Sequence, residues 1–252
     1  MRNPVTRRNV LLGASGMVLT GVGVGVTRDT LDLDPVSFTA GAVLTPDGTL
    51  ADTNSQQTDG DGRHLRVDWR EEYNGRVVEN PDVRTEAQAT SGPLIDLDDV
   101  KPGDEGLLVL QVSVAREASR VVLSLPLVET DENGQNEAEE KSPDPLPGEG
   151  ELQRHVDLAL WYDSGVVVES IGGCNGDRER GESLIAAGTL AAVADQLEAG
   201  RVLTPPGASD GCLAAGDSFC LALNWALDEA VGNVIQSDSA SFVVGLQLQP
   251  CR

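Results

Sequence analysis

The sequence predicts an all-β fold, an antiparallel β-sandwich with one inserted α-helix. The main observation is a period-two alternation of apolar and polar residues, which is typical of strands that are buried on one face. Eight or nine such segments follow one another with turn-forming residues between them, as in a sandwich. A single further segment has helical spacing, and a lone helix in such a protein is expected to cover an open end or face of the sheets.

In chain order, the first expected strands are weak candidates at Val36–Leu44, Arg63–Trp69 and Arg76–Glu79. The first strong strand is Leu107–Val114 (LLVLQVSV). Its even-numbered positions are all large and apolar, whereas the polar residues Gln111 and Ser113 lie on the opposite face. This pattern predicts one core-facing side, made of Leu108, Leu110, Val112 and Val114.

The next expected strand, Arg120–Val128, contains Pro126. Proline cannot donate to a strand ladder, so this strand lies at a sheet edge or breaks at that residue.

Beyond it, Glu129–Glu151 holds nine acidic residues and three prolines without an apolar period, which predicts a long, solvated and mobile loop. A domain boundary at this place is the alternative, but neither flank alone has enough strands to close a sandwich.

Strands continue in the C-terminal half of the chain, where they form one weak and three strong candidates. Each strong candidate places four large residues on one face, and the weak one is short. The four segments are His155–Tyr162, Val166–Ser170, Phe219–Leu227 and Ser241–Gln249. Gly232-Asn233 tolerates left-handed backbone conformations and is predicted to form the hairpin turn between the last two strands.

The expected helix is Thr189–Ala199 (TLAAVADQLEA). Thr189 suits the N-cap position, and Gly200 follows the last periodic residue. The apolar positions recur at helical spacing, so one side of this helix is predicted to pack on the sheets. They are Leu190, Val193, Ala194 and Leu197.

Residues 1–26 are predicted to be an export signal, and residues 27–252 a single β-sandwich domain. Arginines precede an apolar run from Val10 to Val26, and no acidic residue occurs before Asp29. The pair Arg7-Arg8 indicates a twin-arginine signal. An ordinary secretory signal in which the two arginines occur by chance is one alternative. An uncleaved anchor is another, since no Ala-x-Ala cleavage site is present. The signal predicts an extracellular or cell-surface location.

The chain is strongly acidic, with a formal net charge of −23. A polyanion repels nucleic acid and anionic membrane surfaces, so neither is expected as a partner beyond the signal segment. Lysine is scarce and only 3% of residues are aromatic, which favours a protein of strongly saline surroundings, where charge repulsion is screened. An ordinary acidic secreted protein is the alternative. The apolar content of 40% is sufficient for one sizeable core.

Four cysteines lie in the C-terminal third of the chain, and an even number behind an export signal indicates two disulfides. Three pairings are possible. We expect Cys174–Cys212 and Cys220–Cys251, because the second would tie the chain end to a neighbouring strand. A zinc site is the competing interpretation, but the spacing contains no CxxC pair.

No catalytic motif is present, and the chain is predicted not to be an enzyme. The two histidines, His64 and His155, form neither an HExxH sequence nor a recognisable triad with a serine elbow. No cofactor is expected. Two stretches nevertheless offer the oxygens that calcium prefers, although neither matches an EF-hand register. They are Asp59-Gly60-Asp61 and the segment that contains Asn175, Asp177, Glu179 and Glu182.

Three segments of the chain resemble the TasA/camelysin-like family of SipW-type signal-peptide proteins, in the version found in salt-loving archaea. They are Phe38–Gly41 (FTAG), Leu97–Gly106 (LDDVKPGDEG) and Gly232–Gln249, which is followed by Cys251. The resemblance covers most of residues 36–252. It implies a jelly-roll-like sandwich that is exported and forms fibres of the extracellular matrix. Some relatives carry the label of metalloprotease, an activity for which this chain lacks the histidine ligands.

In that family a freed N-terminal segment adds as a strand to the next subunit. The corresponding donor here is about Thr27–Val36, in which Leu31 and Leu33 would fill pockets. The resemblance therefore implies a non-enzymatic cell-surface or matrix protein whose partner is another copy of itself or another cell-surface protein. A monomeric surface-anchored module that binds cations or glycans is the alternative.

Overall fold

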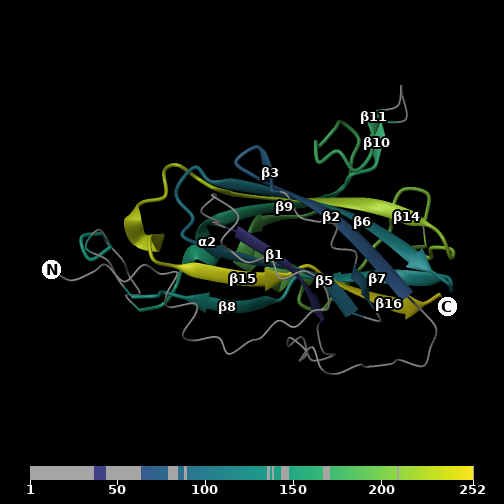
Figure 1. The fold of residues 1–252 in the computed structure, drawn as a ribbon, viewed down its shortest axis with the longest axis horizontal. Helices are drawn as coiled ribbons and strands as arrows, with labels where there is room; N and C mark the ends of the chain where they lie inside the picture. Colours follow the sequence, from purple (N-terminus) through teal and green to yellow (C-terminus); the bar gives the residue numbers. More distant parts are fainter. Residues whose placement is uncertain are drawn as a thin grey trace. The chain divides into compact units, whose positions relative to one another are not determined.

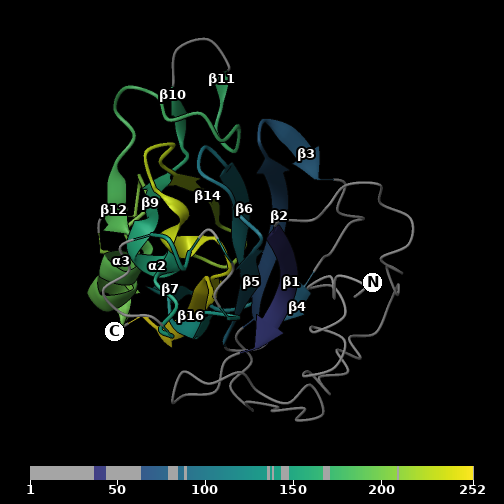
Figure 2. The same ribbon diagram turned by 90° about the vertical axis from the view of Figure 1, so that its left-hand side faces the viewer.

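The computed structural model of the protein describes residues 37–43, 64–78, 85–87, 90–134, 137, 139–142, 148–166, 171–208 and 210–251. These residues confirm the all-β prediction, because two antiparallel sheets of seven strands each account for most of them. Figure 1 shows the first sheet below the second, and Figure 2 shows the same two layers from the side.

The first sheet, named here the β5 sheet, has the order β13-β7-β16-β5-β15-β8. Strand β1 also pairs with β5, along the edge of β5 opposite to β15 and β16. Its strands come from the whole length of the described chain. They are β1 (Ser37–Val43), β5 (Thr90–Asp98), β7 (Ser119–Ser124), β8 (Leu127–Asp131), β13 (Arg201–Val202), β15 (Ser239–Val243) and β16 (Gly245–Pro250).

The second sheet, named the β14 sheet, has the order β12-β9-β14-β6-β2-β3, with β4 also on β2. A separate two-stranded hairpin is formed by β10 (Gly165–Val166) and β11 (Ile171–Gly172). The strands of the β14 sheet are β2 (His64–Tyr73), β3 (Arg76–Val78), β4 (Thr85–Ala87), β6 (Glu105–Ala115), β9 (Val156–Tyr162), β12 (Leu184–Thr189) and β14 (Ser218–Leu227).

One continuous apolar core contains side chains of both sheets, which makes the arrangement sandwich-like. The β5 sheet contributes Val121, Phe242 and Leu246, among others, and the β14 sheet contributes residues such as Leu110 and Leu223. All four alternating sets predicted from the strong strands lie in this core. Period-two alternation thus identified the buried faces, whereas a jelly-roll connectivity stays a prediction.

Strand β5 lies inside its sheet but was not expected from the sequence, because Gly92 and Pro93 interrupt its pattern. The registers of its neighbours explain how the proline is accommodated. On one side of β5, Leu94 pairs with Val243 of β15, whereas Ser91 pairs with Leu246 of β16. Pro93 therefore lies between the stretch of β5 that pairs with β15 and the stretch that pairs with β16. Its missing N–H removes no ladder hydrogen bond to either of these two strands.

The predicted break at Pro126 is confirmed, since β7 ends at Ser124 and β8 begins at Leu127. The hairpin predicted at Gly232-Asn233 is wrong. Strand β14 belongs to one sheet and β15 to the other, so they do not pair with each other. Gly232 has a φ of −75° and caps the 3-10 helix η2 (Asn233–Ile235), so the chain crosses between the sheets there instead of turning back.

The predicted helix is confirmed as α3 (Leu190–Leu197), and its four apolar residues are buried. The Thr189 side chain accepts a hydrogen bond from the backbone N–H of Ala192, at 3.3 Å, as an N-cap residue should. The prediction of one helix is incomplete, because a second short helix, α2 (Leu152–His155), precedes β9. A helix of one turn carries too few positions for a helical period to be recognised.

The segment Glu129–Glu151 is not a solvated loop throughout. Residues up to Asp131 belong to β8, and Glu132, Glu139 and Glu151 are buried. Composition alone misled here, because an acidic side chain that accepts specific hydrogen bonds inside a fold looks the same in sequence as one in water.

Candidate cation site

All four cysteines are in disulfides, as predicted, but the predicted pairing is wrong. The bonds are Cys174–Cys220 and Cys212–Cys251, with Cα–Cα distances of 5.4 and 5.6 Å. Backbone pairing explains both. Cys174 donates its N–H to the carbonyl of Asp163, whose own N–H donates to the carbonyl of Cys220. The end of β9 therefore brings the first pair together.

The second disulfide depends on Ser119, the first residue of β7. Ser119 forms a β-bridge with Leu213, and it is also the ladder partner of Pro250 in β16. Cys212 directly precedes Leu213, and Cys251 directly follows Pro250. Both cysteines therefore lie next to Ser119 at the start of β7, where they can form a disulfide. Such long-range pairings are not visible in the spacing of cysteines along the chain.

Two of the four residues proposed as calcium ligands, Glu179 and Glu182, approach a third carboxylate, that of Asp163. One carboxylate oxygen from each lies within 4.8 Å of the other two, and we name this group the Asp163 cluster. Of the remaining two, Asp177 is exposed and stays outside the cluster, whereas the Asn175 amide donates to Glu179 at 2.6 Å. The segment thus supplies two ligand candidates and one supporting side chain.

Asp163 was missed by sequence reasoning, because it lies in a different segment from the acidic run. It directly follows β9 and is 1% exposed. Its Oδ2 accepts the N–H of Gly176 at 2.7 Å, whereas its Oδ1 has no hydrogen-bond partner among the described residues. The available signal was an aspartate at the end of a strongly alternating strand, followed by a Ser-Gly turn.

Glu182 holds the turn after β9 in place. Its Oε1 accepts the N–H groups of Ser164 and Gly165 at 2.8 and 2.9 Å, and its Oε2 accepts that of Glu179 at 3.0 Å. Burial raises the pKa of Glu182, and the nearby charge of Glu179 raises it further, while the backbone donors lower it. Excess negative charge is therefore costly at this place, which favours a positive ligand.

The segment that carries Glu179 lies directly on the outer face of the β14 sheet. A Cβ at Gly176, where φ is +87°, would lie 2.5 Å from Leu107 and 3.0 Å from Val109. The Arg70 guanidinium of β2 donates to the carbonyl of Asn175 at 2.7 Å. Because the sheet, Arg70 and the Cys174–Cys220 disulfide all fix this segment, the carboxylates are held before any ligand arrives.

The Asp163 cluster suits a hard divalent cation. Calcium binds oxygen ligands at about 2.4 Å, so two oxygens on one ion are at most about 4.8 Å apart. The three carboxylate oxygens satisfy this limit. The buried atoms Asp163 Oδ1 and Glu179 Oε2, which lack hydrogen-bond partners in the described part of the chain, keep lone pairs for an ion.

A cavity of about 590 Å³ adjoins the cluster. Asp163, both cysteines of one disulfide and Cys212 of the other line it, together with the ring pair Tyr162 and Phe219, whose centroids are 6.4 Å apart. Of the three residues of the Asp163 cluster, Asp163 is the one that lines this cavity.

The remaining predicted site residues lie outside the described ranges. These are the export-signal residues Arg7 and Arg8, the donor-strand residues Leu31 and Leu33, and the candidate calcium stretch Asp59-Gly60-Asp61. Within the described ranges, no helix combines the length and apolar character needed to span a membrane.

Comparisons with models of protein families, with curated proteins and with solved structures gave no match.

Proposed function

We propose that the protein is an exported, non-enzymatic β-domain of the cell surface or extracellular matrix that assembles with further copies by strand addition. The observation that carries this proposal concerns the sheet edges. Four outer strands each carry a large apolar side chain that is 39–54% exposed, and β-strand addition requires open edges of this kind. The four residues are Val77 in β3, Val128 in β8, Leu184 in β12 and Val202 in β13.

Two further observations support an exported structural role. Both disulfides fit an oxidising compartment, where such bonds persist. They also occupy every cysteine, so the chain offers no thiol as a nucleophile. The resemblance to the TasA/camelysin-like family adds the specific mode of assembly, in which Thr27–Val36 is the donor segment.

Replacing both Leu31 and Leu33 with aspartate is expected to reduce assembly at least about tenfold. Burying two leucine side chains in a neighbouring subunit contributes about 3–6 kcal/mol, which charged residues would forfeit. Electron microscopy and sedimentation of secreted protein in strong salt measure the fibre fraction. Thr30→Asp is the control, because it adds charge on the alternate face of the same segment and should leave fibres in place. Unchanged fibres in the leucine variant would rule out this donor strand.

The Asp163 cluster favours a second candidate function, a surface module that binds calcium. This function is compatible with the first, because calcium between fixed carboxylates stabilises a folded domain by mass action.

We expect Asp163→Asn to weaken calcium binding at the Asp163 cluster at least about tenfold, since one of three charged ligands is lost. Calorimetric titration of full-length protein in strong salt gives the affinity. Asp157→Asn is a matched control, because Asp157 is an exposed residue of β9, the strand that Asp163 follows. Equal calcium affinity in the two variants would contradict a cation site at Asp163.

A further inference from the structure

A second group of carboxylates lies at one end of the β5 sheet, in residues that the sequence did not single out. Glu132 follows β8, Glu151 is the N-cap residue of α2, and Asp238 precedes β15. One carboxylate oxygen from each lies within 4.8 Å of the others, and the residues are 9%, 5% and 1% exposed. We name this group the Asp238 cluster.

The fold itself brings these like charges together. Asp131 pairs with Ser239 in the antiparallel ladder of β8 and β15, and one further step in this register places Glu132 opposite Asp238. Like charges directly opposite each other destabilise a strand pair. Gly150 then brings Glu151 close, because its backbone is so near β8 that a Cβ would lie 2.6 Å from the Asp131 carbonyl.

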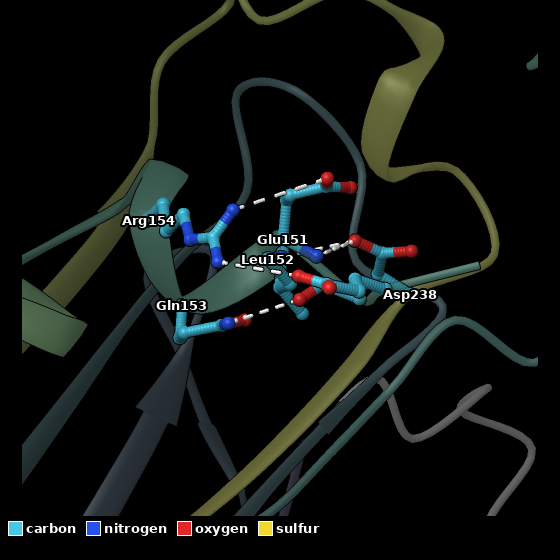
Figure 3. Close-up of polar contacts among 7 residues, drawn as sticks. Glu151, Leu152, Gln153, Arg154 and Asp238 are labelled. Atoms are coloured by element: carbon cyan, nitrogen blue, oxygen red, sulfur yellow. Dashed lines mark hydrogen bonds and ion pairs between the residues drawn. The ribbon is translucent and has the colours of Figure 1, made fainter. Parts of the chain in front are cut away.

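Hydrogen bonds hold one oxygen of Asp238 and leave the other available. Asp238 Oδ2 accepts the N–H groups of Glu151 and Leu152 at 2.5 and 3.0 Å, as Figure 3 shows. Asp238 Oδ1 is buried and has no hydrogen-bond partner within the described ranges. An unpartnered carboxylate oxygen that is buried among other carboxylates points to a cationic ligand.

One described cation, Arg154, lies at the margin of the cluster. Arg154 Nη1 lies 4.0 Å from Glu151, and its Nη2 lies 3.7 Å from the more exposed Glu149. All three carboxylates of the cluster are almost fully buried. Burying several like charges together is costly, and a bound cation would offset that cost.

We propose that Glu132, Glu151 and Asp238 bind a divalent cation of the calcium type, at a site separate from the Asp163 cluster. All three donors are carboxylates, which suit hard cations rather than zinc or copper. This inference does not depend on export or fibre assembly.

The segment between β8 and α2, residues 132–151, is named here the acidic connection. A bound ion would link both of its ends to the β5 sheet. Glu132 and Glu151 are the end residues of the connection, and Asp238 lies opposite them on the sheet. Between these ends, Glu139 is already attached, because it accepts the N–H of Ser237 at 2.6 Å and the hydroxyl of the same residue. Binding would therefore change how often Glu132 and Glu151 separate from Asp238, and the rate of cleavage at Lys141 measures this change.

Calorimetric calcium titration tests the ligand set. All variants carry Asp163→Asn, so that the Asp163 cluster does not contribute. We expect Asp238→Asn and Glu132→Gln each to remove one bound ion, or to weaken its binding at least about tenfold. Asparagine at position 238 keeps an oxygen for the two backbone donors while removing the charge. Glu140→Gln is the control, because Glu140 is an exposed residue of the same connection and should bind like its parent. Unchanged ion number and affinity in both cluster variants would overturn the proposal.

Proteolysis of the full chain tests the consequence by a second readout, first without any substitution and then in two variants. Lys101 and Lys141 are its two lysines, and Pro102 protects the first from lysine-specific proteolysis. Lys141 is 70% exposed and lies inside the connection. If opening precedes cleavage, free calcium at about ten times its Kd should slow cleavage after Lys141 about tenfold, and magnesium should do less. The Asp238→Asn variant should lose this protection and Glu140→Gln should keep it. Equal cleavage with and without calcium would contradict the proposed fastening.

Discussion

Replacing Cys212 and Cys251 with serine is expected to lower the free energy of unfolding by about 4 kcal/mol. The disulfide closes a loop with a sequence separation of 39, and the chain-entropy relation for such a loop gives this magnitude. The effect is large because typical domains are stable by only about 5–15 kcal/mol. Urea unfolding in strong salt, followed by circular dichroism, measures it.

The matched control removes the other disulfide. Replacing Cys174 and Cys220, which are 46 residues apart, should cost a similar amount, because loop entropy grows slowly with length. Non-reducing peptide mapping tests the pairing directly, since cleavage at Asp195, Asp217 and Asp228 places the four cysteines on four different peptides. Recovery of a Cys174–Cys212 peptide would show that the sheet registers around Ser119 differ from those described.

Phe242→Ala is expected to cost about 3–5 kcal/mol of stability. Phe242 is the largest of the fully buried side chains, and it lies on β15 in the core that the two sheets share. Its removal leaves a cavity between two layers that cannot collapse without shifting whole strands. Urea unfolding in strong salt measures the difference.

Gln247→Ala provides the control for this position. Gln247 is an exposed residue of β16 in the same sheet, so its replacement should change stability by less than about 0.5 kcal/mol. A loss of less than about 1 kcal/mol for Phe242→Ala would contradict a core packed between the two sheets.

Local patterns in the sequence predicted local structure well. Alternation located three of the four strong strands and the buried faces of all four, Thr189 marked the start of α3, and Pro126 marked a break between strands. The fourth prediction, a single strand over Ser241–Gln249, is wrong, because the chain divides at Val244 into β15 and β16, which have different partners. Each correct feature depends on residues that are close in the chain. Strand β5 was missed for the same reason, because the accommodation of Pro93 depends on two distant partner strands.

Long-range relations could not be predicted. The pairing of cysteines follows from the ladder partners of Ser119 and the contacts of Asp163, neither of which spacing reveals. In the Asp163 cluster, the acidic run supplied Glu179 and Glu182, whereas Asp163 joins them through the end of β9. The Asp238 cluster depends entirely on a strand register between distant segments. Composition gave no indication of it, because acidic residues are common throughout the chain.

The two disulfides overlap in sequence, because Cys212 lies inside the loop that Cys174–Cys220 closes. Tension applied along the backbone must therefore pass from Cys174 across to Cys220, backwards to Cys212, and across again to Cys251. Fully extended, residues 174–251 would span about 260 Å, whereas the stretch between Cys212 and Cys220 spans about 30 Å. Stretching an oxidised chain by its ends should thus lengthen the C-terminal third very little. A thread of such domains would resist elongation there by covalent bonds alone, even after its sheets had come apart.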